Sequence, residues 1–258
     1  MSKLFSVVTE IQVMKQLCTR TFNMTTLPLA ALLPFIIIIC VACLFLPVQA
    51  LAHNVTAGDA GYIQEIWGVH LIPFAYLGAK HMVTGYDHIL FLFGVVFFLY
   101  KLTDVAIYVS LFAIGHSITM LGGVWLGIGV NAYIIDAIIG LSVVYKALDN
   151  LGAYQRWFGV QPNTKAATLI FGLFHGTGLA TKILDYEISA DGLLPNLLAF
   201  NVGVELGQIM ALAVILIVMG CWRKRTNFFQ QAYTANVVMM FLGFLLTGYQ
   251  VAGYLVYV

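Results

Sequence analysis

Charged residues are scarce in this 258-residue sequence. Asp, Glu, Lys and Arg together make up 9% of the chain, whereas hydrophobic residues make up 61%. A typical soluble domain carries about 25% charged residues, so the composition excludes an ordinary soluble protein and favours a polytopic membrane protein. The formal net charge of +1 also argues against nucleic acid as a partner, because phosphate binding needs a basic patch.

Cysteine is sparse too, and the four cysteines form no metal or disulfide framework. Cys40 and Cys43 have CxxC spacing within an apolar stretch that we expect to be removed, and Cys18 and Cys221 are isolated. The sequence also lacks a phosphate-binding glycine loop with lysine, a serine elbow and an HExxH motif. We therefore do not expect an enzyme.

Residues 1–52 have the pattern of a secretory signal peptide. A long basic n-region precedes the apolar stretch 27–46, and Ala50-Leu51-Ala52 forms a small-residue cleavage site. We expect cleavage to leave His53 at the start of an exterior polar segment, residues 53–70. The alternatives are a later start codon and an uncleaved anchor, since about 20 apolar residues span a bilayer. An N-terminal His53 could chelate a copper-like ion through its α-amine and imidazole.

Apolar blocks predict an all-α bundle of six transmembrane helices in residues 71–258. Each block is close to the length of a membrane helix. The first is too long for one perpendicular span, so we expect it to tilt, to break near Gly85 or to begin as a surface helix. The blocks are residues 71–100, 105–121, 133–148, 166–184, 193–222 and 233–258.

Basic residues lie in alternate connections between these blocks. Lys101 follows the first block, Arg156 and Lys165 lie between the third and fourth, and Arg223-Lys224-Arg225 follows the fifth. By the positive-inside rule these connections face the cytoplasm. The sequence therefore predicts a multi-pass protein of the bacterial inner membrane with both mature termini outside.

Two histidines and a carboxylate, His81, Asp87 and His88, lie within the first apolar block. Such groups are costly in hydrocarbon, so they are functional candidates by default. On a straight helix His81 and His88 share a face but lie about 10 Å apart, so sharing one ion requires a kink. Gly85 can supply it, and Thr84 can bond a freed carbonyl. Asp87 then either binds the ion or orients a histidine of a neighbouring span.

Further polar residues are expected at a similar depth, namely His116, His175 and Glu205, with Asn201 and Gln208 on the same helix face as Glu205. Imidazoles with one or two carboxylates suit a divalent transition metal such as nickel, cobalt or copper. The alternative is a structural polar network between spans.

Other polar residues are expected to be structural. Asp136 should be solvated near the membrane boundary, and His70 and Lys80 should be interfacial. Asp149-Asn150 should end a helix. Glycines 172, 176 and 178 should let helices approach closely around His175.

Four short motifs follow one another along the chain: His81-x-x-x-Gly85-x-Asp87-His88, Ile114-Gly115-His116-Ser117-Ile118-Thr119, Phe171-Gly172-Leu173-Phe174-His175-Gly176 and Phe200-Asn201-x-Gly203-Val204-Glu205. In this order they resemble the signatures of the HupE/UreJ family of hydrogenase and urease accessory membrane proteins. The resemblance implies a nickel or cobalt permease whose metal site contains the histidines and aspartate of the first motif. Met82 stands where the nickel-permease branch usually has proline, so the chain looks like the larger branch.

Two other readings stay open. The chain could be a non-transporting metal-binding subunit of a membrane or exported oxidase or hydrogenase complex, with a link to copper. It could also bind haem through His88, His116 and His175. The expected partners are a transition-metal ion, the lipid bilayer and a metalloenzyme client.

Overall fold

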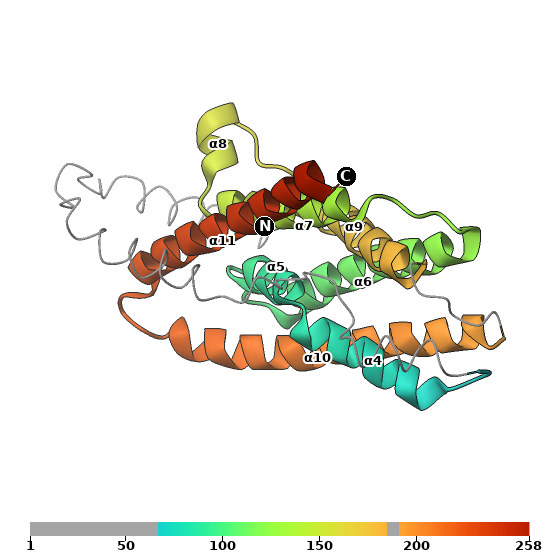
Figure 1. Cartoon of the computed structure of the whole chain (residues 1–258). Helices are drawn as coiled ribbons and strands as arrows, with labels where there is room; N and C mark the ends of the chain where they lie inside the picture. The colour runs from blue at the N-terminus through green and yellow to red at the C-terminus, as the bar shows by residue number, and fades with distance from the viewer. Residues whose placement is uncertain (1–66, 185–190, 258) are drawn as a thin grey trace, which may run out of the picture. The chain divides into compact units, whose positions relative to one another are not determined.

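A computed structural model describes residues 67–184 and 191–257, and within these ranges the regular structure is entirely helical (Figure 1). The predicted signal peptide, His53 and most of the polar segment after it lie outside the described residues. The helices are α4 (Leu71–Thr84), α5 (Tyr86–Val96), α6 (Leu102–Leu126), α7 (Ala132–Asn150), α8 (Ala153–Phe158), α9 (Thr164–Leu184), α10 (Leu193–Trp222) and α11 (Phe228–Tyr257).

The helices coincide with the apolar blocks of the sequence, which confirms the all-helical prediction. The first block divides at Gly85 into α4 and α5, and α7 ends at Asn150 as expected. Within the described residues, four helices are long and apolar enough to cross a membrane: α6, α9, α10 and α11. Helix α7 has 19 residues and carries three charged side chains, Asp136, Lys146 and Asp149.

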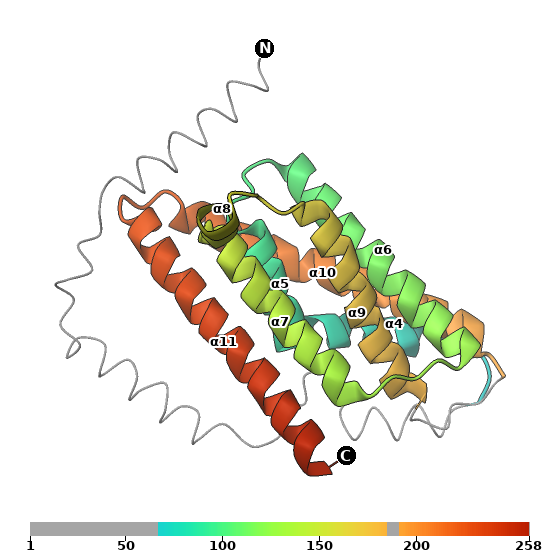
Figure 2. The same ribbon diagram turned by 90° about the horizontal axis from the view of Figure 1, so that it is seen from above.

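Three helix pairs surround α5. Helix α4 packs on α10, α6 on α9 and α7 on α11, as Figures 1 and 2 show. Helix α5 contacts α4, α6, α7, α10 and α11, so it lies at the centre of this arrangement. The residues at its N-terminal end are therefore accessible to side chains from several helices.

Close backbone contacts fix the direction of each pair. On α6 and α9, Phe112 lies against Gly172 and His116 lies against Gly176, so the two helices run parallel. By the same criterion α4 and α10 are parallel, whereas α7 and α11 are antiparallel. Hydrogen bonds between the pairs show that α6 is antiparallel to α10 and that α7 is antiparallel to α9. The direction therefore alternates along the chain from α4–α5 through α6, α7, α9 and α10 to α11, as consecutive membrane spans would require.

Asn196 joins the first turns of α4 and α10. Its amide nitrogen donates to the Gly68 carbonyl over 2.9 Å, and its side-chain oxygen accepts from the His70 backbone N–H over 2.7 Å. Gly192, which precedes α10, has φ +76° and lies so close to Gly68 that a Cβ would collide with the Gly68 carbonyl. The starts of these two helices are thus held at the same level.

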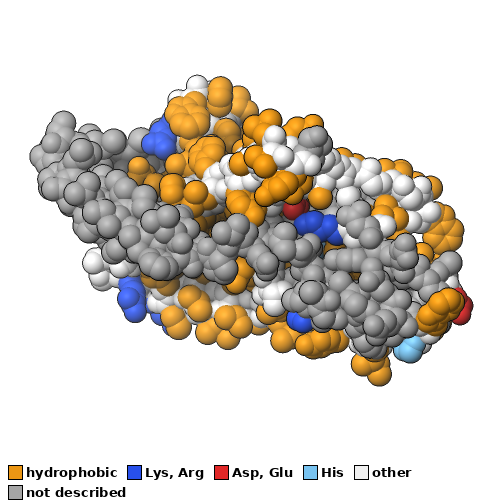
Figure 3. Space-filling view, in the orientation of Figure 1, with side chains coloured by type: hydrophobic (Ala, Val, Ile, Leu, Met, Phe, Trp, Pro, Cys, Tyr) orange, Lys and Arg blue, Asp and Glu red, His pale blue; other side chains and the backbone are white. Residues whose placement is uncertain are grey.

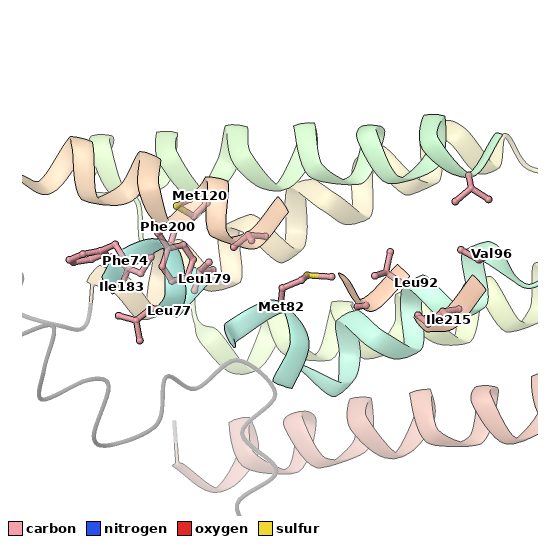
Figure 4. Close-up of a cluster of buried hydrophobic side chains, with 14 of the residues drawn as sticks. Phe74, Leu77, Met82, Leu92, Val96, Met120, Leu179, Ile183, Phe200 and Ile215 are labelled. Carbon is pink, nitrogen blue, oxygen red and sulfur yellow. The ribbon is translucent and has the colours of Figure 1, made fainter. Parts of the chain in front are cut away.

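The main hydrophobic core joins the α4–α10 and α6–α9 pairs. Phe74, Met120, Leu179 and Phe200, one from each of these helices, are buried in one cluster (Figure 4). Hydrophobic side chains are also prominent on the outer surface (Figure 3). Helix α10 alone exposes nine large ones between Leu194 and Val218. An apolar exterior of this extent fits a helix surrounded by lipid.

We predict that Gly203→Ala destabilises the fold by about 1–3 kcal/mol, as overpacking usually does. A Cβ at residue 203 would collide with the backbone carbonyl of Ala75, so α4 and α10 would have to separate. Gly220→Ala on the same helix is the matched control, because a Cβ there meets nothing within 4 Å. Thermal unfolding in detergent should show a lower midpoint for Gly203→Ala only; equal midpoints would contradict the close contact.

Candidate metal centre

Five polar side chains from four helices converge beside the N-terminal end of α5. His81 comes from α4, Asp87 and His88 from α5, His116 from α6 and His175 from α9. His81 is 9% exposed, and the other four are 0–1% exposed. The structure thus brings together every predicted metal ligand except Glu205.

The break at Gly85 makes this convergence geometrically feasible. Gly85 is extended, with φ −72° and ψ 105°, and its N–H ends α4 by donating to the His81 carbonyl over 3.0 Å. Thr84 donates to the Lys80 carbonyl over 2.8 Å, the bond expected from the sequence. The ring centroids of His81 and His88 consequently lie 5.0 Å apart, about half the separation on a straight helix.

Gly85 also leaves room for the His88 ring. A Cβ at residue 85 would lie 2.5 Å from His88 Nδ1 and 3.1 Å from Asp87 Oδ1. A side chain at this position would therefore displace two of the five polar groups. The glycine has a steric role here in addition to ending the helix.

Asp87 lies between two histidines. Its Oδ1 is 3.3 Å from His88 Nδ1, and its Oδ2 is 4.0 Å from His175 Nε2. Ligand atoms around one tetrahedral ion at about 2.0–2.1 Å are about 3.4 Å apart. The first distance already fits a shared ion, and the second needs a movement of less than 1 Å.

The hydrogen bond of His175 defines its tautomer. His175 Nδ1 lies 2.8 Å from the Phe171 carbonyl oxygen. Because a carbonyl can only accept, Nδ1 carries the proton, and in the neutral ring Nε2 presents its lone pair towards Asp87. Metal-binding histidines are usually oriented by a bond of this kind.

Aromatic rings enclose the cluster. Phe112 packs edge-on against His175 with ring centroids 4.9 Å apart, and Phe91 lies 5.7 Å from the same ring. Phe200 lies 6.0 Å from His81. The phenyl rings exclude water, which strengthens any electrostatic interaction between the polar groups and a cation.

The five side chains form two overlapping groups of three. In one, ligand atoms of His81, His88 and His116 all lie within 4.8 Å of one another, and in the other those of Asp87, His88 and His175 do. Both are found among the described residues, and His88 belongs to both. The arrangement offers a nitrogen-only set and a mixed nitrogen and oxygen set side by side.

Glu205 does not join the cluster. It lies on the exposed face of α10, whereas Gln208 is buried and donates weakly to the Val109 carbonyl over 3.5 Å. The expectation that Glu205 and Gln208 share a face therefore needs correction. Their spacing of three residues leaves about 60° between their directions, and the boundary of the packed face of α10 falls between them.

We had expected Asp136 to be solvated, and this prediction is wrong. Asp136 is buried and forms an ion pair. Lys182 Nζ, from the last turn of α9, donates to Asp136 Oδ2 over 3.0 Å, and both side chains are less than a tenth exposed. Lys182 lies two helical turns beyond His175 on α9, and this position directs it towards α7.

A second buried ion pair lies at the opposite end of α7. Lys146 Nζ is 2.5 Å from Asp149 Oδ2, and Gln161 and Thr164 also donate to the Asp149 carboxylate. Burial, and secondarily the charge of Asp149, raise the pKa of Tyr154 in the short helix α8. Thr164 begins α9, so each end of the α7–α9 contact is held by a carboxylate.

The sequence analysis did not predict the hydrogen bonds that join neighbouring helices around the histidines. Ser117 and Asn201 exchange hydrogen bonds of 2.8 and 3.0 Å between α6 and α10. Thr119 donates to the Leu173 carbonyl over 2.7 Å and so joins α6 to α9. The available signal was that Ser117 and Thr119 share a short motif with His116, and that Asn201 lies in the motif that ends at Glu205.

Together these features define a class of protein, an integral membrane helix bundle with a buried cluster of imidazoles and one carboxylate. The family described as HupE / UreJ protein matches residues 57–258. The chain belongs to this family, which comprises membrane accessory and transport proteins that handle nickel or cobalt. No curated protein and no solved structure matches the chain.

We predict that Asp136→Asn destabilises the protein by about 3–5 kcal/mol, because it leaves the Lys182 ammonium buried beside a neutral amide. The double variant Asp136→Leu with Lys182→Met removes both charges and should recover most of the loss. Reversible unfolding in mixed micelles measures both effects. A loss below about 0.5 kcal/mol for Asp136→Asn would contradict the buried pair, since that is typical of surface substitutions.

Proposed function

We propose that this protein is a permease of the bacterial inner membrane for a divalent transition-metal ion, nickel or cobalt. The observation that carries this proposal is the convergence of four histidines and Asp87 from four helices in an apolar surrounding. Membership of the HupE / UreJ family supports the same cargo.

The donor chemistry favours such a cargo. Neutral imidazoles bind nickel, cobalt, copper and zinc well, whereas magnesium and calcium prefer oxygen donors. Asp87 supplies one negative charge that partly offsets the charge of a dication in a low dielectric. The His175 bond to the Phe171 carbonyl orients one imidazole in advance.

The proposed topology has six spans. Helices α4 and α5 form one span broken at Gly85, and α6, α7, α9, α10 and α11 form the others. Support comes from the alternating helix directions and from basic residues in alternate connections. In this topology both mature termini face the exterior, and the first 52 residues serve as the signal peptide.

A haem-binding role is less well supported by the packing. An axial histidine binds the iron at the centre of the flat haem ring, so that ring must fit beside the imidazole. The rings of Phe112 and Phe91 pack directly on His175 instead. A non-transporting accessory subunit, including one linked to copper, would retain the cluster and bind metal without moving it.

We expect His88→Ala to abolish nickel accumulation, because His88 belongs to both groups of potential ligands. The matched control is His70→Ala: the His70 side chain bonds the Trp67 carbonyl and lies outside the cluster. Accumulation of Ni²⁺ in cells and in proteoliposomes, normalised to the protein inserted in the membrane, is the measurement.

Two outcomes would go against the permease. Unchanged accumulation in His88→Ala would remove His88 from the pathway. Tight Ni²⁺ binding by the unaltered protein together with no uptake into proteoliposomes would favour the accessory subunit.

A further inference from the structure

We propose that the cluster holds one cation at a time in two successive positions that share His88. The outer position consists of His81, His88 and His116, and the inner position of Asp87, His88 and His175. This inference rests on the proposed transport of a divalent metal and adds how the ion passes through the cluster.

The grouping of the ligand atoms is the first argument. Within each group of three, all ligand atoms lie within 4.8 Å of one another. His88 is the only residue that belongs to both groups. The ring centroids of His88 lie 5.0 Å from His81 and 6.2 Å from His116, and 5.1 Å from His175. The other four residues therefore lie around His88 rather than around a single central point.

Burial gives the order of the two positions. His81, in the outer group, is 9% exposed, whereas His116 and the three members of the inner group are 0–1% exposed. His81 also lies in α4, before the break at Gly85, while Asp87 opens α5 after it. An ion that arrives from the N-terminal side of α4 therefore meets His81 first, and His81 belongs to the outer position only.

Charge limits the occupancy to one ion. The outer group contains only neutral donors when its imidazoles are deprotonated, and the inner group adds the single carboxylate of Asp87. Two dications beside one carboxylate would leave three uncompensated positive charges in an apolar site, which is strongly unfavourable. Because Asp87 attracts the cation, the inner position should be the tighter one.

A shared ligand explains how the ion can move. A bare dication between two sites would lose all its ligands in a low dielectric, at a prohibitive cost. His88 can stay bound while His81 and His116 are exchanged for Asp87 and His175. The ion then keeps at least one protein ligand throughout the step.

The test compares His116→Ala with His175→Ala, which remove one imidazole each from the outer and the inner group. Equilibrium dialysis of the purified full-length protein against Ni²⁺ should give one ion per chain for the unaltered protein and for both variants. His116→Ala should keep its affinity within about threefold, whereas His175→Ala should bind about tenfold more weakly. Both should lose at least about tenfold of the uptake rate in proteoliposomes, since each interrupts the sequence of positions.

Folding is checked by repeating the comparison with His116→Gln and His175→Gln, which retain a polar side chain of similar length. Two ions per unaltered chain, an equal loss of affinity in both variants, or normal uptake by His116→Ala would overturn the two positions while leaving the permease intact. Absence of Ni²⁺ uptake by the unaltered protein would instead overturn the proposed function itself, and this inference with it.

Discussion

The break of the first membrane segment at Gly85 is the constraint on which the centre of the molecule depends. Without it His81 and His88 would lie about two helical turns apart, and Asp87 would point away from both. The extended glycine brings the two rings to 5.0 Å and starts a new helix at Tyr86. Every contact of the cluster with α6 and α9 then follows from the place of α5 between the helix pairs.

Close helix packing supplies the second half of the site. On α9, Gly172 and Gly176 lie against the backbone of α6, which confirms the close approach predicted from these glycines. The contact sets His175 and His116 at similar heights on adjacent parallel helices. These two glycines thus fix the distance between ligands that are remote in sequence, because they let the helices that carry the ligands approach closely.

The sequence predicted the helices well because apolar length and polar interruption are local properties. A break near Gly85 was one of three alternatives that the sequence left open for the first block, beside a tilt and a surface helix, and the structure has the break. It failed where the direction of a side chain around its helix decides the outcome. Glu205 and Gln208 appeared equivalent by spacing, yet only Gln208 faces the interior. The Asp136–Lys182 pair was missed because nothing local indicates which helix lies beside α7.

These ion pairs clarify why Asp87 suits a cation. Asp136 and Asp149, about 20 Å apart along α7, are each paired with a lysine, Lys182 and Lys146 respectively. Asp87 faces His88 and His175, whose charge depends on protonation. When these imidazoles are neutral, the positive charge that balances Asp87 can be supplied by a bound ion. Among the described residues, the buried carboxylates of Asp136 and Asp149 therefore accept bonds that hold α7 to α9, whereas that of Asp87 faces groups whose charge can change.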